Sequence, residues 1–448
     1  MPQVTFPPSR PVRVALALLS LPAALAAQTM SDSLVARAIP LREAVALAQQ
    51  NGLTAIQSRG TVRNAESAVR TARGALLPSL NVSLSQNNTS GDQLNPYTGV
   101  ITPRVATKPW SYSTGLNSSL NLFDGGRRLN EVKRARYDVS AAEASEVNQR
   151  YNVALQVKTQ YYAILAAREA ESAAQAQLQQ AQEQLKTSIL RTRAGVVTLS
   201  DSLRSVITVG NAQLALITAR NNVRVASAAL TRLIGSETLV TAQASDTLDS
   251  GLAPVDSITL ASLLDEGPQV RSSEAQLASA KSAVRSAKTP YLPSLDLTFS
   301  RGGTAANQFY GLNGDPLAFS NTFGLRLSYN LFNNFTREDA LARANVSADL
   351  AEATLRDVRL AARQTLVQQL AALSSAQQRI VIQQASLDAA REDLRVQQQR
   401  YALGASTLLD VLTSQTTLDA ARSALIQARQ DVRIARAQLE ALVGRDLP

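Results

Sequence analysis

Apolar side chains recur at alternating spacings of three and four residues along two stretches of the chain, residues 209–233 and 418–442. The positions are Val209, Ala212, Leu216, Ala219, Val223, Ala226, Leu230 and Leu233, and then Leu418, Ala421, Leu425, Ala428, Val432, Ala435, Leu439 and Leu442. This spacing places them on one face of an α-helix, and the alternation of large residues with alanine lets two helices approach closely. The stripes alone favour an ordinary coiled coil or helix bundle.

Proline and glycine indicate how far these helices extend. Proline disrupts helix interiors, and none occurs in residues 110–253 or 317–447. Glycine is rare in the same spans, so we predict two long helical hairpins. Their helices cover about residues 127–194 and 199–234, with a turn at Gly195, and about residues 337–403 and 407–443, with a turn at Gly404. A helix over residues 127–194 is roughly 100 Å long, which no single-domain core requires.

Four shorter segments alternate apolar and polar residues with the period of a β-strand. Their apolar positions are Leu80, Val82 and Leu84; Leu116, Leu120 and Leu122; Leu295, Leu297 and Phe299; and Phe323, Leu325, Leu327, Tyr329 and Leu331. The other face carries Asn, Ser, Asp and Arg, as in a membrane barrel with a wet lumen. Of the 19 aromatic residues, 13 lie in residues 97–123 and 291–335, which is consistent with aromatic girdles. A soluble β-sandwich that caps the helices is the alternative.

Four strands cannot close such a barrel by themselves. The smallest membrane barrels have about eight strands, and open sheet edges are not tolerated in lipid. Several copies of the chain must therefore share one barrel. Three copies would supply about twelve strands and four copies about sixteen, and the strand pattern does not choose between them.

The chain is internally duplicated. Leu-Pro-Ser-Leu occurs at residues 77–80 and 292–295, and Asn-Leu-Phe at 121–123 and 330–332. Gly195, Asp201 and Gly235 recur as Gly404, Asp410 and Gly444. We predict a first repeat over residues 27–235, with a helix, a β-hairpin at about 76–123 and a helical hairpin at about 127–235; a linker at 236–258; and a second repeat over 259–448, with a helix, a β-hairpin at about 292–332 and a helical hairpin at about 337–444.

The N-terminal segment is typical of an exported protein. Arg10 and Arg13 precede a short apolar run over residues 14–25, which ends at a small-residue cleavage site. We expect residues 1–26 to be a signal peptide, because the run is too short to span a bilayer. No later segment has about 18 consecutive apolar residues, so we expect no membrane-spanning helix.

The composition argues against catalysis. The chain contains neither cysteine nor histidine, which removes thiol nucleophiles, disulfides and imidazole bases or metal ligands. No glycine-rich phosphate loop is present, and the carboxylates are scattered. We therefore expect a protein that is not an enzyme and that needs no cofactor or metal.

The net charge of +10 could indicate nucleic acid, but the basic residues are interleaved with 35 acids along the helical stretches, so we expect no nucleic-acid partner. The densest basic cluster is Arg127, Arg128, Lys133, Arg134 and Arg136. It is either a solvated helix start or a contact with anionic lipid headgroups beside a barrel.

The two hairpin turns share the form Gly-x-x-Thr-x-x-Asp, at residues 195–201 and 404–410. Together with Leu-Pro-Ser-Leu before each β-hairpin and Asn-Leu-Phe before each long helix, this motif resembles the TolC-like outer-membrane efflux family. The resemblance covers essentially the whole mature chain. It implies a mainly α fold with a small β part: a homotrimer in which twelve strands form an outer-membrane barrel and twelve helices form a periplasmic α-barrel tube. It also implies a periplasmic adaptor and an inner-membrane pump as partners, and contact with outer-membrane lipid.

The resemblance also assigns residues at the periplasmic tip. The gate or constriction would include Asp410, Thr413, Tyr401, Ser200 and Asp201. The adaptor-docking tip would include Gly195, Val196, Val197, Gly404, Ala405, Ser406 and Leu408. Thr413 stands where relatives have a second acid, and Ser406 stands where they have an arginine that completes a latch. The physical alternatives are left-handed turns at the two glycines, N-terminal caps at Ser200, Asp201 and Asp410, and core packing at Tyr401.

We therefore predict a passive duct that exports small molecules as the outer-membrane subunit of a tripartite efflux system. A protein-secretion duct of type I has the same architecture. A structural coiled-coil protein that spaces the envelope without conducting is a third possibility, although it would need no polar face on its strands.

Overall fold

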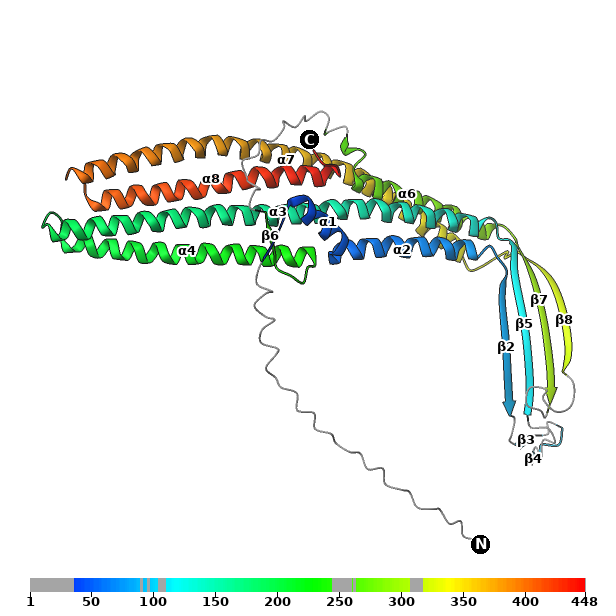
Figure 1. Cartoon of the computed structure of the whole chain (residues 1–448). Coiled ribbons are helices and arrows are strands. Elements are labelled where there is room, and N and C mark those ends of the chain that lie inside the picture. Colours follow the sequence, from blue (N-terminus) through cyan, green and yellow to red (C-terminus); the bar gives the residue numbers. More distant parts are fainter. Residues whose placement is uncertain are drawn as a thin grey trace, which may run out of the picture.

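The structure is a computed structural model, and it describes residues 36–88, 92–94, 97–103, 110–243, 260, 263–306 and 317–447. The expected signal peptide, residues 1–26, lies outside the described residues, as does the linker from residue 244 to 258. The remaining chain forms a long layer of helices with a small sheet at one end (Figure 1).

Four long helices build most of the layer. Helix α3 (Arg127–Arg193) is joined to α4 (Leu199–Ile234), and α7 (Thr336–Ala402) to α8 (Leu408–Val443). α3 and α7 have 67 residues each, and α4 and α8 have 36 each. The helices end within one or two residues of the predicted positions, because the breaks come from local glycine turns.

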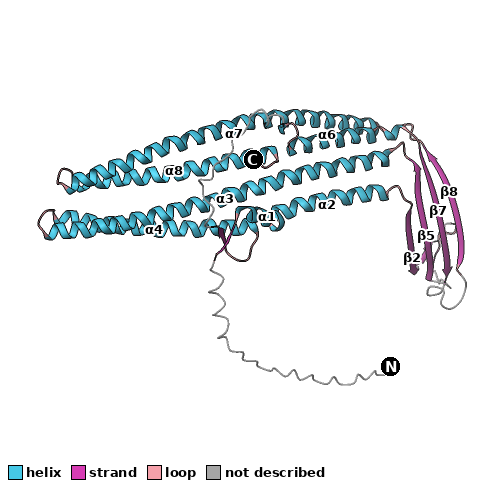
Figure 2. Cartoon of the chain, turned by 45° about the horizontal axis from the view of Figure 1, so that its top comes forward, coloured by secondary structure: helices cyan, strands magenta, loops and turns pink. Residues whose placement is uncertain are grey.

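The two hairpins lie side by side in the order α7, α8, α3, α4 (Figure 2). The heptad positions face the contacts inside this layer: Leu216 and Leu230 of α4, and Leu418, Leu425 and Leu439 of α8, are all buried. Large residues thus meet small ones between closely packed helices, as their spacing predicts.

Shorter elements continue the layer toward the sheet. Helices α1 (Leu41–Asn51) and α2 (Leu53–Gly74) pack against α3. Helix α6 (Pro268–Ala287), followed by the 3₁₀ turn η2 (Thr289–Tyr291), packs against α3 and α7.

The expected linker begins with a structured segment. Strand β6 (Val240–Ala242) pairs in parallel with β1 (Arg37–Ile39) across the helices. The Tyr161 hydroxyl of α3 donates to the Ile39 carbonyl at 3.0 Å and accepts from the Gln243 N–H at 3.1 Å. Because all three residues of β6 are buried, this part of the chain belongs to the core. Three residues are too short for a period-2 pattern to reveal a strand.

The sheet contains four antiparallel strands in the order β2–β5–β7–β8. They are β2 (Ser79–Asn88), β5 (Trp110–Phe123), β7 (Ser294–Ala306) and β8 (Ala318–Ser328). The central β5–β7 pair joins the two predicted repeats. Two short strands, β3 (Asp92–Leu94) and β4 (Ile101–Pro103), pair with each other. Tyr329 and Leu331, which we expected on the last strand, lie beyond the end of β8.

The register sorts the side chains into two faces. Directly paired residues share a face, and on one face Leu297 pairs with Leu120 and Leu325. On the other face, Asp296 pairs with Asn121 and Arg326. The Asn121 amide donates to the Asp296 carboxylate at 2.7 Å. The row Asn81, Asn117, Ser300 and Thr322 extends these polar groups across all four strands. The other side is mainly apolar, with Arg301 and Asn321 paired beside Leu116.

The junction between sheet and helices is held by an arginine. The Arg128 guanidinium lies 2.9 Å from the Asp124 carboxylate and donates to the Ala75 carbonyl at 3.0 Å. It also donates to the Asn121 side-chain oxygen at 2.8 Å. Arg128 is therefore a structural member of the basic cluster, whereas Arg127 and Arg134 keep exposed side chains. Among the described helices, none is long and apolar enough to cross a membrane.

Candidate gate and docking tip

Both hairpin turns lie at the end of the molecule opposite the sheet (Figure 1). Gly195 has φ +71° and Gly404 has φ +75°. The Val196 N–H donates to the Arg191 carbonyl at 3.0 Å, and the Ala405 N–H to the Arg400 carbonyl at 2.8 Å. These bonds span six residues and close each helix in a Schellman motif, which favours glycine at the left-handed position. A Cβ at either glycine would meet nothing within 4 Å.

The surface of the tip is partly apolar. Val196, Gly404 and Ala405 are exposed, as expected for a docking surface, whereas Val197 and Ser406 are half-buried. Leu408, which we expected at the docking tip, is only 3% exposed in the single chain. It is buried at the start of α8, as is Val411 three residues further on.

Two leucines supply exposed apolar surface that sequence reasoning missed. Leu403 and Leu409 flank the second turn, and both are exposed. Extending the α8 heptad pattern backward from Leu418 gives Ser414, Val411 and Thr407, so this pattern by itself does not assign Leu408 to the core.

Asp201 and Asp410 cap the two short helices of the hairpins. The Asp410 carboxylate accepts from the Thr407 N–H at 2.8 Å and from the Thr407 hydroxyl at 2.7 Å. Asp201 accepts from the Thr198 N–H at 3.3 Å and from its hydroxyl at 3.1 Å. The Thr407 backbone bond, followed by the Thr407 and Ser406 hydroxyls, lowers the pKa of the Asp410 carboxyl. The structure therefore gives Asp410 a local capping role, and its charge is retained at the exposed tip.

The remaining gate candidates have distinct surroundings. The Ser406 hydroxyl lies 3.1 Å from both the Asp410 carboxylate and the Gln397 side-chain oxygen. Thr413 is exposed and donates its hydroxyl to the Leu409 carbonyl, within its own helix, at 2.9 Å. Ser200 is exposed at the second position of α4. Within one chain, these three side chains do not meet as a single site.

Tyr401 connects the two hairpins. The Cζ atom of Arg191, on α3, lies 5.2 Å from the centroid of the Tyr401 ring. The ring also packs against the core between α7 and α8. Among the described residues its buried hydroxyl has no hydrogen-bond partner. Arg191 was not a candidate in the sequence, because only the fold brings the first hairpin beside the second.

A polar seam lies further along the contact between α3 and α8. The Gln177 amide donates to the Asp419 carboxylate at 2.7 Å, and the Gln180 amide donates to the Gln415 side-chain oxygen at 2.7 Å. Gln415 in turn donates to Asp419 at 3.2 Å. Burial raises the pKa of the Asp419 carboxyl, although the Gln415 bond and Arg422 act in the opposite direction. These side chains tie the two hairpins together.

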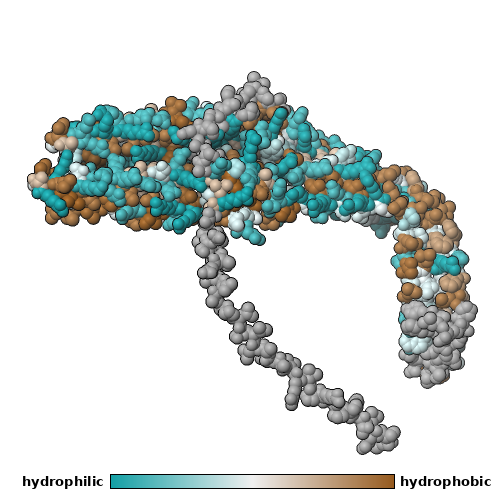
Figure 3. Space-filling model, viewed as in Figure 1, coloured by the Kyte–Doolittle hydropathy of each residue, from teal (hydrophilic) through white to brown (hydrophobic). Residues whose placement is uncertain are grey.

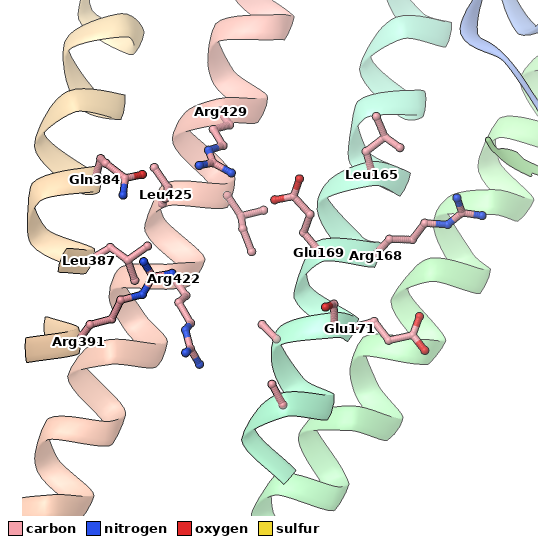
Figure 4. A pocket seen from close by; sticks show the side chains of 14 residues that line it. Leu165, Arg168, Glu169, Glu171, Gln384, Leu387, Arg391, Arg422, Leu425 and Arg429 are labelled. Carbon is pink, nitrogen blue, oxygen red and sulfur yellow. The ribbon is translucent and has the colours of Figure 1, made fainter. Parts of the chain in front are cut away.

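A cavity of about 730 Å³ lies beside this seam, between α3, α7 and α8 (Figure 4). Arg391, Arg422 and Arg429 line it on the α7 and α8 side, and Glu169 points toward them from α3. Glu171 is paired instead with Arg220 of α4, at 3.3 Å. The lining contains no activated nucleophile and no acid–base pair suited to catalysis. Among the described residues, no group of three or more acids could hold a metal ion.

Comparison with solved structures identifies the fold. CusC matches with a TM-score of 0.76 and 20% identity, over 92% of this chain and 94% of that one. The MtrE outer membrane channel of Neisseria gonorrhoeae matches with a TM-score of 0.73 and 21% identity, over 90% of this chain and 89% of that one. VceC of Vibrio cholerae matches with a TM-score of 0.73 and 18% identity, over 91% and 97%.

Sequence comparison identifies relatives and the family. The pyoverdine export outer membrane protein OpmQ of Pseudomonas aeruginosa is 28% identical over 399 residues, which cover 86% of this chain and 79% of OpmQ. The outer membrane efflux protein BepC of Brucella suis is 24% identical over a region that covers 90% of this chain and 85% of BepC. The model of the outer membrane efflux protein family matches residues 45–236 and 259–445. The chain therefore belongs to the outer membrane efflux protein family, the TolC-like channels, and is a protein of the outer membrane whose helices lie on the periplasmic side.

Proposed function

We propose that three copies of the chain form a passive duct, the outer-membrane subunit of a tripartite efflux system. The observation that carries the proposal is the sheet. Its apolar face is open, with Leu325 67% and Leu327 71% exposed, and its other face is polar across all four strands. In lipid, this arrangement is stable only when the sheet closes around a wet lumen.

The edges of the sheet support closure by several copies. Among the described residues, β2 and β8 each pair with one strand of the sheet, so each presents an unpaired edge. Pairing of β8 in one copy with β2 in the next satisfies both edges. Three copies give about twelve strands, the number that the family resemblance implies.

The helices support a tube in the same way. α7 and α4 form the two edges of the helical layer (Figure 2), and both carry exposed apolar residues. The exposed residues are Leu203, Ile207, Leu214 and Ile217 on α4, and Leu350, Leu360, Val367 and Val381 on α7. Contact between α7 of one copy and α4 of the next buries both rows, which the hydrophobic effect favours. The match of the family model to residues 45–236 and 259–445 supports the division into two repeats.

In this proposal the two turns form the periplasmic tip. Exposed Val196, Ala405 and Leu409 contribute to the surface that docks a periplasmic adaptor, which couples the duct to an inner-membrane pump. Asp410, and Asp201 beside it in the tube, place negative charge near the constriction, where three copies of each carboxylate favour cations. Tyr401 and Arg191 hold neighbouring hairpins in the closed state.

The cargo proposed is a small molecule, an inference supported by the relative named for pyoverdine export. Electron microscopy of the detergent-extracted mature protein tests the architecture. We expect tubes of roughly 130 Å, from about 100 Å of helix and about 30 Å of barrel, with threefold end views. Flexible rods or small globular particles would instead favour a coiled-coil scaffold that does not conduct.

A further inference from the structure

The cavity between α3, α7 and α8 has a basic lining. Four arginines and two glutamates line it, so the lining carries a positive charge. One of the glutamates, Glu171, is already paired with Arg220 of α4 at 3.3 Å. The volume of about 730 Å³ lies within the range of about 300–1,000 Å³ that small-molecule sites occupy. The cavity is formed by the helices of one chain, so it does not depend on assembly into a duct.

Helical spacing explains why the arginines gather at this cavity. Arg422 and Arg429 lie three residues before and four residues after Leu425, a buried residue of α8, so all three share one face of the helix. On α7, Arg391 lies four residues after Leu387, which is also buried. Each arginine therefore lies beside a leucine of the core, on the α7 and α8 side of the cavity (Figure 4).

Small residues on α3 leave the space open. Ser172, Ala173 and Ala176 line the α3 side, where larger side chains would fill the cavity. Leu165 of α3 and Ile426 of α8 add apolar surface to that of the two leucines on α7 and α8. Figure 3 shows hydrophilic residues over most of the visible face of the long helices, and hydrophobic residues gathered over the sheet. A ligand of this cavity therefore combines charged groups with an apolar body.

Arg391 and Arg422 have only loose contacts with acids of the chain. The Arg391 guanidinium lies 3.4 Å from the Asp388 carboxylate on its own helix, and both side chains are more than half exposed. Arg422 lies 3.6 Å from the Asp419 carboxylate, which already accepts from the Gln177 amide at 2.7 Å. Charge-assisted hydrogen bonds are normally about 2.7–2.9 Å long. A guanidinium has five N–H donors, so within the described part of the chain most donors of both arginines are open to a ligand.

We propose that this cavity binds a small aromatic carboxylate anion, with its carboxylates on Arg391 and Arg422 and its rings against the leucines. The planar guanidinium pairs with carboxylates through two hydrogen bonds and stacks on aromatic rings. A compact inorganic anion would leave the apolar surface uncovered, and a cation would meet the positive lining. The anion is either a cargo molecule in the duct or a solute of the periplasm. Only the first source rests on the proposed function.

Fluorescence anisotropy with carboxyfluorescein tests the binding. This dye carries carboxylates on a flat ring system, and tetramethylrhodamine ethyl ester is a cation with a related ring system. Each dye is titrated with the full-length mature protein in a neutral detergent. We expect a saturable rise in anisotropy for carboxyfluorescein that added salt weakens, and no rise for the cation. Equal binding of both dyes would overturn the proposal, because the site would then not select a negative charge.

Substitution of the arginines locates the site. We expect Arg391→Gln and Arg422→Gln each to lower the affinity for carboxyfluorescein about tenfold or more, because each removes a charge-assisted contact. The matched control is Arg395→Gln, one turn further along α7. Arg395 does not line the cavity and donates to Glu392 at 2.8 Å. Unchanged affinity in the first two variants, or an equal loss in the control, would attribute binding to general surface charge and overturn the proposal.

Filling the cavity provides a second measurement that leaves the charge unchanged. Ala176 is exposed on α3, so Ala176→Phe places a ring in the cavity without entering the core. We expect this variant to lose carboxyfluorescein binding even if an arginine variant does not fold. Retained binding would overturn the proposed site.

Export by cells distinguishes the two sources of the anion. Loss of carboxyfluorescein export in the double variant Arg391→Gln/Arg422→Gln, with unchanged export of the rhodamine cation, would identify the ligand as cargo. Unchanged export of both dyes, together with lost binding, would identify it as a periplasmic solute. Failure of the parent protein to export either dye would contradict the proposed function and leave the binding result intact.

Discussion

Replacement of Gly404 distinguishes a docking surface from a simple turn. Its φ of +75° is a left-handed conformation, in which a residue with a Cβ costs about 1–2 kcal/mol. A Cβ at this position would meet nothing within 4 Å, so the first side-chain atom adds no steric cost. The flanking helices are held by buried Leu408 and Val411, so about 1–2 kcal/mol does not unfold the hairpin. Gly404→Leu therefore places a bulky side chain on the exposed tip while the fold is retained.

We expect Gly404→Leu to abolish export and to leave the trimer intact. The matched control is Gly126→Leu, since Gly126 has φ +87° and equally open surroundings but lies at the other end of the molecule. Both variants carry the same kind of strain. The assay compares drug tolerance of cells that lack their own channel with the amount of cross-linked trimer in their membranes. Normal export by Gly404→Leu would refute docking at this turn, and equal loss in both variants would attribute the effect to strain.

Four further predictions test the sheet, the tip and the buried ion pair between α3 and α8. Leu325→Arg places a charge on the lipid face, so it should lower the stability of the membrane-inserted protein by about 2–4 kcal/mol and prevent membrane assembly. The control Thr322→Arg, on the polar face, should be tolerated. A membrane-inserted Leu325→Arg trimer would contradict the strand register. Asp410→Ala should change single-channel conductance or cation preference, and identical currents would show that it does not face the constriction. Because the pKa of Asp410 is lowered, its contribution to stability is present above the unfolded-state pKa and should disappear as the pH falls through the lower folded-state value. Lys158→Ala should lower the free energy of unfolding by roughly 1–3 kcal/mol, because among the described residues Glu440 then keeps only the more distant Arg436 guanidinium, at 3.8 Å. The Lys158 and Glu440 side chains are only 16% and 11% exposed, and a double-mutant cycle with Glu440→Ala, followed by denaturant unfolding, measures their coupling.

Local chemistry accounts for what the sequence predicted well. The long helices end where Gly195 and Gly404 adopt left-handed conformations, and no long-range contact is needed for that. The strands were visible because one face is apolar and the other polar over about ten residues. Tyr329 and Leu331 continued the same alternation past the end of β8, where hydrogen bonding and not periodicity decides the boundary. The alternation of apolar and polar residues therefore predicted the two faces of the sheet more accurately than it predicted where the strands end.

The candidate site was less predictable, because its contacts depend on how the halves of the chain meet. Family resemblance drew attention to Asp410 and Tyr401 but not to their partners. The capping partner Thr407 is three residues from Asp410 and could have been identified from the sequence. Arg191, beside Tyr401, comes from the other hairpin, and nothing in the spacing of either helix indicates this contact.

The contact between α3 and α8 changes in character along its length. Near the middle of the molecule, Lys158 pairs with Glu440 in largely buried surroundings. Closer to the tip the contact consists of amide bonds, such as that from Gln177 to Asp419, and at the tip itself Arg191 of α3 contacts the Tyr401 ring at the end of α7. Loss of one partner of a buried ion pair costs about 3–5 kcal/mol, whereas an amide bond to a carboxylate contributes about 1.5–3 kcal/mol and a neutral bond, such as that from Gln180 to Gln415, about 1 kcal/mol. The two hairpins should therefore separate from the tip inward, and the pair near the middle limits how far they part.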